Sequence, residues 1–205
     1  MRAYSLLFLT GLLGFAVMAG FAAAFDYFAG DLWISHRLQE IDNGTFKEAL
    51  DVAEDLSDTP AVIIVWLVAA IAAFAAGQRW PAAVVLLSIL SRLLNVLLKE
   101  IINRPRPSPE LVQVTGVSGD FAFPSGHTMG AVVLYGLIAY FSTKLVKRGL
   151  IRLPIILACL YVIAFTAMER IYSGQHWFSD VYGAFLFGGL CLAILIWCEH
   201  RLSRR

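Results

Sequence analysis

Long apolar runs alternate with short polar segments along the whole chain. Six of these runs are each close to the length of about 20 residues that a helix needs to cross the hydrocarbon core of a bilayer. They occupy roughly 4–25, 60–77, 81–98, 128–146, 153–169 and 181–198. A soluble protein of 205 residues with six such runs would have too little polar sequence left to cover its surface. The pattern predicts an all-α, polytopic membrane protein with six transmembrane helices.

The first run also resembles the apolar part of a signal peptide, with Ala22, Ala23 and Ala24 as a possible cleavage site. The apolar part of a signal peptide is only about 7–15 residues long, and this run is longer. We therefore interpret residues 1–24 as a retained helix.

Segment 26–59 has a different pattern, in which single apolar side chains recur among acidic ones. That spacing predicts one or two short amphipathic helices at the membrane interface, which we expect to act as a lid or spacer. We find no internal repeat, low-complexity tract or domain linker. Residues 1–205 are therefore expected to form one domain.

The composition supports a membrane protein, because charged residues make up 15% of the chain against roughly 25% in an average soluble domain. The net charge of +1 and the lack of a long basic run exclude nucleic acid as an expected partner. Cys159, Cys191 and Cys198 all fall in apolar runs, without metal-ligand spacing. We interpret them as packing residues. The oligomeric state cannot be predicted from the sequence.

Basic residues gather on one predicted face of the membrane, together with both termini. They are Arg2, Arg79, Lys144, Lys147, Arg148, Arg152, Arg201, Arg204 and Arg205. The positive-inside rule makes this face, and hence both termini, cytoplasmic. Segment 26–59 has nine of the fifteen Asp and Glu residues and is expected outside, together with loops 99–127 and 170–180.

Polar residues of chemical interest fall in three places on that outer face. The first is segment 99–107, where Lys99 ends an apolar run and Arg104 and Arg106 alternate with prolines that keep the backbone extended. Lys and Arg together suit a phosphate dianion. The alternative is that these side chains only extend to the lipid headgroups.

The second place is segment 124–127, directly before the fourth apolar run. Ser125 is in the position of a helix N-cap, Gly126 lets an anion approach the backbone, and His127 lies in the first turn. This arrangement predicts an anion site beside a proton donor. An ordinary N-cap with an interfacial histidine is the alternative.

The third place is segment 170–180, which leads into the sixth apolar run. His176 and Asp180 are four residues apart, so on a helix the carboxylate can hold one imidazole nitrogen and leave the other as a nucleophile or base. A structural His–Asp cap would also explain the pair. Arg170 adds a third cation.

These three motifs resemble the signature of the type 2 phosphatidic acid phosphatase superfamily. Lys99 to Pro107 matches Lys-x6-Arg-Pro, Pro124 to His127 matches Pro-Ser-Gly-His, and Arg170 to Asp180 matches Arg-x5-His-x3-Asp. The resemblance implies that His176 is the nucleophile forming a phosphohistidine, that Asp180 orients it, and that His127 is the general acid. It also implies a set of phosphate-binding residues: Lys99, Arg106, Ser125, Gly126 and Arg170.

The resemblance implies an integral membrane phosphatase that removes the terminal phosphate of a lipid phosphate or diphosphate at the outer face. The size and layout are similar to bacterial phosphatases of undecaprenyl pyrophosphate and phosphatidylglycerophosphate. We expect no cofactor and no metal, because the motifs lack a carboxylate cluster. Alternatives are a lipid phosphotransferase and a non-enzymatic lipid transporter. Vanadium-dependent haloperoxidases share the motifs but are soluble.

Three residues near the motifs depart from this scheme. The family usually has Ser where this chain has Glu169, and we expect Glu169 to brace a neighbouring cation. Arg104 is either a second phosphate contact or a solvated neighbour of the site, and we favour the latter interpretation. Arg92 lies inside an apolar run, where an arginine costs on the order of 2.5–3.5 kcal/mol. It either supports Lys99 from the same helix face or extends to the membrane surface.

Overall fold

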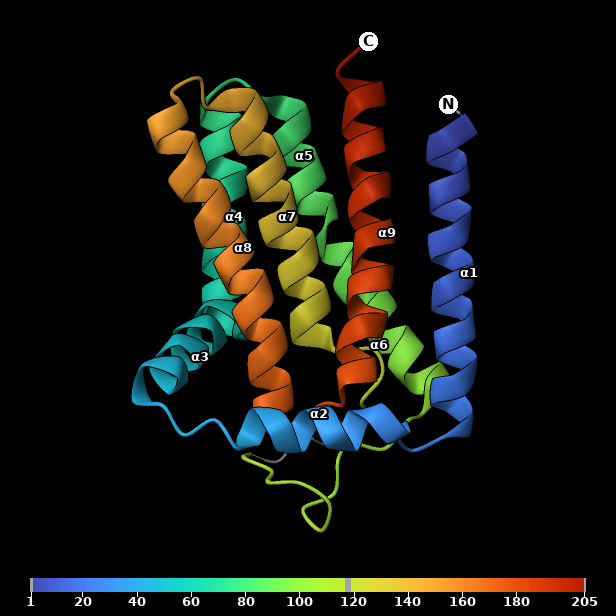
Figure 1. Cartoon of the computed structure of the whole chain (residues 1–205). Helices are drawn as coiled ribbons and strands as arrows, with labels where there is room; N and C mark the ends of the chain where they lie inside the picture. Colours follow the sequence, from blue (N-terminus) through green and yellow to red (C-terminus); the bar gives the residue numbers. More distant parts are fainter. Residues whose placement is uncertain (1, 117–118, 205) are drawn as a thin grey trace.

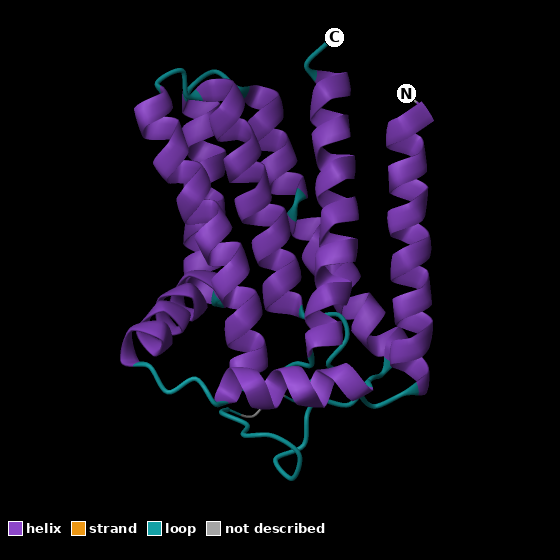
Figure 2. Ribbon diagram, in the orientation of Figure 1, coloured by secondary structure: helices purple, strands orange, loops and turns teal. Residues whose placement is uncertain are grey.

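The computed structural model describes residues 2–116 and 119–204, and all the regular structure in these ranges is helical. Figures 1 and 2 show a bundle of helices that cross the molecule from end to end, with shorter helices at one end. In chain order the helices are α1 (Arg2–Ala24), α2 (Ala29–Gln39), α3 (Gly44–Ser57), α4 (Thr59–Ala75), α5 (Arg79–Leu87), α6 (Ile89–Ile102), α7 (Gly126–Leu145), α8 (Gly149–Tyr172) and α9 (Phe178–Leu202).

The six apolar runs coincide with helices, except for one or two residues at the ends of three of them. Five stretches of the described residues are long and apolar enough to cross a membrane, namely α1 from Ser5, α5 with α6, α7, α8 and α9. Helix α4 passes the same test together with α3, from which it is bent by 62°. The prediction of an all-α membrane protein is confirmed, with five spanning segments among the described residues, or six if the bent pair of α3 and α4 is counted as one span.

The run predicted as one helix at 81–98 contains two helices that meet at Ser88. The Ser88 hydroxyl donates to the Val85 carbonyl at 2.6 Å, and the Trp66 indole donates to the same carbonyl at 2.7 Å. Side-chain hydrogen bonds of this kind compete with the helical pattern and bend helices. Hydropathy alone does not reveal such a break.

Segment 26–59 forms the two short helices that its pattern predicts. Helix α2 lies across one end of the bundle, and α3 lies beside α8 at the same end (Figure 1). Helix α3 begins after Asn43, whose side chain accepts a hydrogen bond from the Phe46 amide at 3.0 Å. Asn43 is thus an ordinary N-cap.

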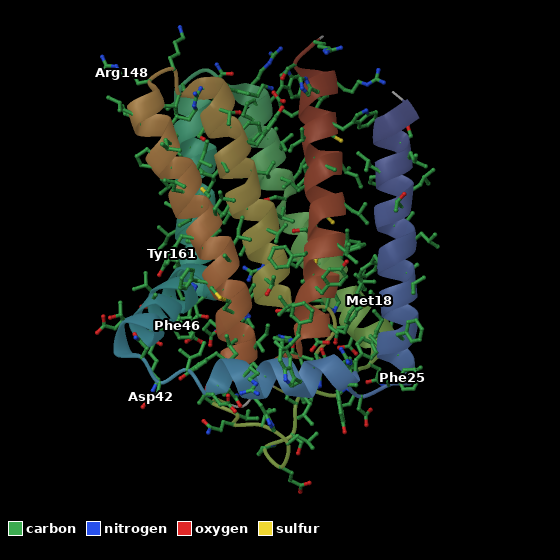
Figure 3. The ribbon with its side chains drawn as sticks, viewed as in Figure 1. Met18, Phe25, Asp42, Phe46, Arg148 and Tyr161 are labelled. Atoms are coloured by element: carbon green, nitrogen blue, oxygen red, sulfur yellow. The ribbon has the colours of Figure 1, made fainter. Side chains whose placement is uncertain are left out.

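Both termini lie at one end of the bundle, and α2 with the long loop before α7 lies at the other (Figure 1). Figure 3 places Arg148 at the end with the termini and Asp42 at the opposite end, as the distribution of charge predicts. Arg205 and the side chain of Arg2 lie outside the described residues. The side of the membrane that each end faces stays a prediction.

Helix α7 lies at the centre of the bundle and contains the largest share of its buried apolar side chains. Met129, Val133 and Leu137 pack against Val84 of α5 and Ala184 of α9. This packing fixes the first turn of α7, where His127 lies, relative to the ends of its neighbours. Two of the three cysteines agree with their interpretation as packing residues, because Cys191 belongs to this core and Cys159 to a second apolar cluster, while Cys198 is only partly buried.

Candidate active site

The three predicted motifs meet at the end of the bundle away from the termini. A pocket of about 290 Å³ opens there between α6, α7 and the loop before α7. Four of the predicted site residues line it: Lys99, Arg106, Gly126 and His127. The other four lie buried behind it: Ser125, Arg170, His176 and Asp180.

Two of the predicted phosphate-binding cations share one anion in this structure. The Asp120 carboxylate contacts the Lys99 ammonium through one oxygen and the Arg106 guanidinium, at 2.5 Å, through the other. Burial alone would raise the pKa of Asp120, but Lys99 and Arg106 outweigh it and lower the pKa to about 2. Asp120 is therefore an anion at neutral pH. Lys99 and Arg106 are close enough to bind a single small anion together.

His176 is buried next to these cations. Its Nε2 lies 3.3 Å from Nη1 of Arg106, which faces the pocket. Burial is the main cause that lowers the pKa of His176 well below its ordinary value, and the positive charges of Arg106 and Lys99 add to it. The imidazole is therefore neutral at pH 7, which is the form that a nucleophile requires.

Asp180 lies on the other side of the His176 ring. Its Oδ2 is 3.6 Å from Nδ1 of His176, just beyond hydrogen-bond distance, and that nitrogen has no hydrogen-bond partner in the part of the chain that the structure describes. The same Oδ2 accepts a hydrogen bond from the Trp177 amide at 2.9 Å. The helix start thus fixes the carboxylate beside the ring.

Arg104 holds the second oxygen of Asp180, and the prediction that Arg104 is solvated is wrong. Its side chain is fully buried and contacts Asp180 and Ser179 on α9 and Asp31 on α2. The ring of Phe28 lies 4.9 Å from its guanidinium carbon. The cation is buried because two carboxylates are buried with it.

Arg170 is surrounded by acceptors from three elements. Its guanidinium contacts the carboxylates of Glu169 and Glu54 and donates to the side-chain oxygen of Gln175 at 3.1 Å. Glu169 thus braces a neighbouring cation, as expected from its position. Glu54 comes from α3 and was not predicted as a site residue.

His127 also has a partner that the sequence analysis missed. Its Nε2 lies 3.4 Å from a carboxylate oxygen of Asp58, the residue that joins α3 to α4. This contact joins the first turn of α7 to the residue before α4. Together with Asp31 and Glu54, Asp58 shows that interpreting segment 26–59 as only a lid or spacer is wrong. The acidic excess of the segment was the one signal of this role.

The start of α7 follows the prediction in outline. Ser125 is the N-cap residue, but its hydroxyl lies 3.1 Å from the Thr128 hydroxyl and makes no capping bond to the backbone. A Cβ on Gly126 would lie 2.9 Å from the side-chain oxygen of Asn95 on α6. Gly126 is therefore also needed for the close packing of α6 and α7.

Comparisons with known proteins identify the family that the motifs resemble. The family model described as the PAP2 superfamily matches residues 80–204. Phosphatidylglycerophosphatase B of Bacillus subtilis (strain 168) is 34% identical over 137 residues, which are 62% of this chain and 62% of that protein. The match therefore spans less than two thirds of that relative's length.

A solved structure is similar over nearly the whole fold. It is described as the first transmembrane PAP2 type phosphatidylglycerolphosphate phosphatase from Bacillus subtilis. The TM-score is 0.80 at 26% sequence identity, and the superposition covers 95% of this chain and 96% of that one.

Proposed function

Because the chain belongs to the PAP2 superfamily, we propose that it is a membrane phosphatase that removes the terminal phosphate from a lipid phosphate. The observation that carries this proposal is the carboxylate of Asp120, which Lys99 and Arg106 both contact. Lys99 and Arg106 bind one carboxylate directly beside the buried, neutral His176. A phosphate in that position would place its phosphorus within reach of the imidazole.

The reaction proceeds in two steps. His176 Nε2 attacks phosphorus and forms a P–N bond while the bond from phosphorus to the lipid oxygen breaks. Water then attacks the phosphohistidine, which releases inorganic phosphate and restores the imidazole. Fixed cations stabilise the charge on the equatorial oxygens, which is the main source of rate in phosphoryl transfer. Asp180 orients the ring and favours positive charge on it.

His127 gives its proton to the departing oxygen. It lines the pocket, and its Nε2 lies 3.4 Å from the carboxylate of Asp58. General acid help of this kind contributes roughly 10²–10⁴-fold when the leaving group is an alkoxide. We assign phosphate binding to Lys99, Arg106, Arg170 and the backbone at Ser125 and Gly126.

A second pocket supports a lipid as the substrate. It has a volume of about 270 Å³, is lined mainly by apolar side chains of α4, α6 and α7, and shares Ser91, Arg92 and Gly130 with the first pocket. The shared residues place the two pockets side by side along α6. The apolar pocket is thus in position to take the start of an acyl or prenyl chain whose phosphate lies among the cations.

The similar sequence and the similar solved structure both come from Bacillus subtilis and are both named for phosphatidylglycerophosphate, which favours that lipid as the substrate. We place the reaction at the outer face of the membrane, because the motifs lie opposite the basic end of the bundle. No metal is required in this scheme. Among residues 2–116 and 119–204 no group of three or more His, Cys, Asp or Glu side chains is placed to hold one.

The test is phosphate release by the purified protein in detergent, measured with excess chelator on phosphatidylglycerophosphate, phosphatidic acid and a polyprenyl diphosphate. We expect turnover on at least one lipid, and a loss of more than about a hundredfold in His176→Ala, because the covalent catalyst is gone. Elution of His176→Ala as a single species in gel filtration shows that the lost activity is not a loss of folding.

No release from any lipid would overturn the proposal. Lipid translocation by His176→Ala at the wild-type rate would favour a transporter instead, and transfer of the phosphate to a second lipid would favour a phosphotransferase.

A further inference from the structure

Arg92 is a charged residue at membrane depth that the proposed mechanism does not use. It lies in α6, inside the span Arg79–Ile102, and its side chain is half-buried. Its guanidinium faces α7, because Nε would lie 4.0 Å from a Cβ built on Gly130. Gly130 is three residues after His127, so Arg92 lies against the α7 face that presents the proposed acid.

Arg92 differs from the other cations at this end of the bundle in having no anion. Lys99, Arg104 and Arg170 each contact at least one carboxylate. In the part of the chain that the structure describes, no side chain or backbone group forms an ion pair or hydrogen bond with Arg92. An unpaired arginine inside a membrane span is costly and marks a functional site by default.

The position of Arg92 indicates which anion it binds. It lines both the polar pocket and the apolar one, so it lies where the phosphate end of a lipid meets the chain. Seven residues separate it from Lys99, about 10 Å along the helix. His176 attacks from one side of the transferred phosphate, so the leaving group extends toward His127 and Arg92.

We infer that Arg92 binds a second phosphate in the leaving group of the substrate and selects lipids with two phosphates over lipid monophosphates. This inference rests on the proposed function. In a lipid diphosphate, the oxygen that leaves phosphorus belongs to the second phosphate. In phosphatidylglycerophosphate, it belongs to the glycerol that the phosphodiester joins to the lipid. Arginine suits the second phosphate of either lipid, because its planar fork of donors matches phosphate oxygens.

The experiment compares Arg92→Gln and Arg92→Lys with the wild type on three lipids, each at a fixed mole fraction in the same detergent. Phosphatidylglycerophosphate and a polyprenyl diphosphate each have a second phosphate. Phosphatidic acid has only one. Arg79→Gln is the matched control. It removes the same charge at the other end of the same span, where Arg79 lies over the Trp80 ring.

We expect Arg92→Gln to lower kcat/KM by about tenfold or more on the two-phosphate lipids, the size of a lost hydrogen bond to a charged group. Most of the change should be in KM. Turnover of phosphatidic acid should stay within about twofold, Arg92→Lys should recover part of the loss, and Arg79→Gln should change nothing.

Equal losses on all three lipids would overturn the inference and give Arg92 a structural role. No loss on any lipid would also overturn it, since the side chain then only extends to the membrane surface. In both cases the wild type still releases phosphate, so the proposed function survives. A wild type that hydrolyses none of the lipids would contradict the proposed function itself.

Discussion

Asp120 places a carboxylate between the two cations that the mechanism assigns to the substrate phosphate. The phosphate must displace this carboxylate or share the cations with it. The side chain is about half exposed, at 52%, so it is free to turn into the solvent when the phosphate arrives. Asp120 thus competes with the phosphate, and lowers the affinity of the site for free phosphate.

Replacing Asp120 by Asn should strengthen inhibition by inorganic phosphate. We expect the inhibition constant to fall by up to about fivefold, because ion pairs at exposed sites contribute roughly 0.2–1 kcal/mol. Since the pKa of Asp120 is lowered to about 2, the carboxylate stays charged above about pH 4, and the difference between variant and wild type should be constant from pH 5 to pH 9. It should shrink only as the pH falls toward that pKa.

The measurement is competitive inhibition by phosphate in the lipid phosphatase assay. Glu110→Gln is the control, because Glu110 is an exposed carboxylate of the same loop whose side chain contacts no cation among the described residues. Weaker inhibition in Asp120→Asn would show that the carboxylate organises the two cations for phosphate instead of competing with it.

At the scale of the elements, Arg104 joins α2 to the start of α9. It contacts Asp31 and Asp180, and Asp31 in turn accepts hydrogen bonds from the amide and hydroxyl of Ser179 at 2.8 and 2.6 Å. A carboxylate that orients the proposed nucleophile is therefore fixed by a short helix about 150 residues earlier in the chain. This explains why segment 26–59 is part of the site.

Arg104→Met keeps the length of the side chain but leaves two carboxylates buried without their cation. We expect a loss of about 3–5 kcal/mol in the free energy of unfolding, as is usual when one partner of a buried ion pair is removed. Phosphate release should fall as well, because Asp180 loses its position. Unfolding by denaturant in detergent micelles measures the first effect.

Arg37→Met is the matched control on α2. Arg37 pairs with Glu40 at 2.8 Å on the surface, with both side chains more than 60% exposed, and surface changes of this kind usually stay within about 0.5 kcal/mol. If Arg104→Met were as stable as this control, the buried network would contribute nothing to holding α2 against α9.

At the scale of the whole molecule, the spanning helices could be predicted because a bilayer requires long apolar runs in the sequence itself. The motif residues could be predicted because their types and spacing suit a phosphate. The partners that fix these motif residues in place could not be predicted. Asp31, Glu54, Asp58 and Asp120 contact site residues that are far from them in sequence, and a carboxylate in a polar segment looks the same whether it is exposed or paired.

Arg104 shows the same limit most clearly. It lies two residues from Arg106 in one extended segment, yet its side chain is buried against α2 and α9 while Arg106 faces the pocket. In a regular extended strand, side chains two residues apart point to the same side, so the sequence pattern alone would place both arginines on one face. Their different directions depend on where α2 and α9 pack, and local sequence does not record that.

The orientation of the whole molecule in the membrane is the last prediction. The basic cluster around Lys147 lies at the end of the bundle with the termini, and the loop of Glu110 lies at the end with the motifs, so the positive-inside rule places Glu110 outside and Lys147 in the cytoplasm.

In a variant with its three native cysteines replaced by Ala, Glu110→Cys should react with a membrane-impermeant maleimide in intact cells. Lys147→Cys should react only after the cells are permeabilised, which also shows that it is accessible. Both positions are exposed, so a difference between them reports the side of the membrane and not burial. The reverse pattern would place the active site in the cytoplasm, and the lipid phosphate would then have to come from the inner leaflet.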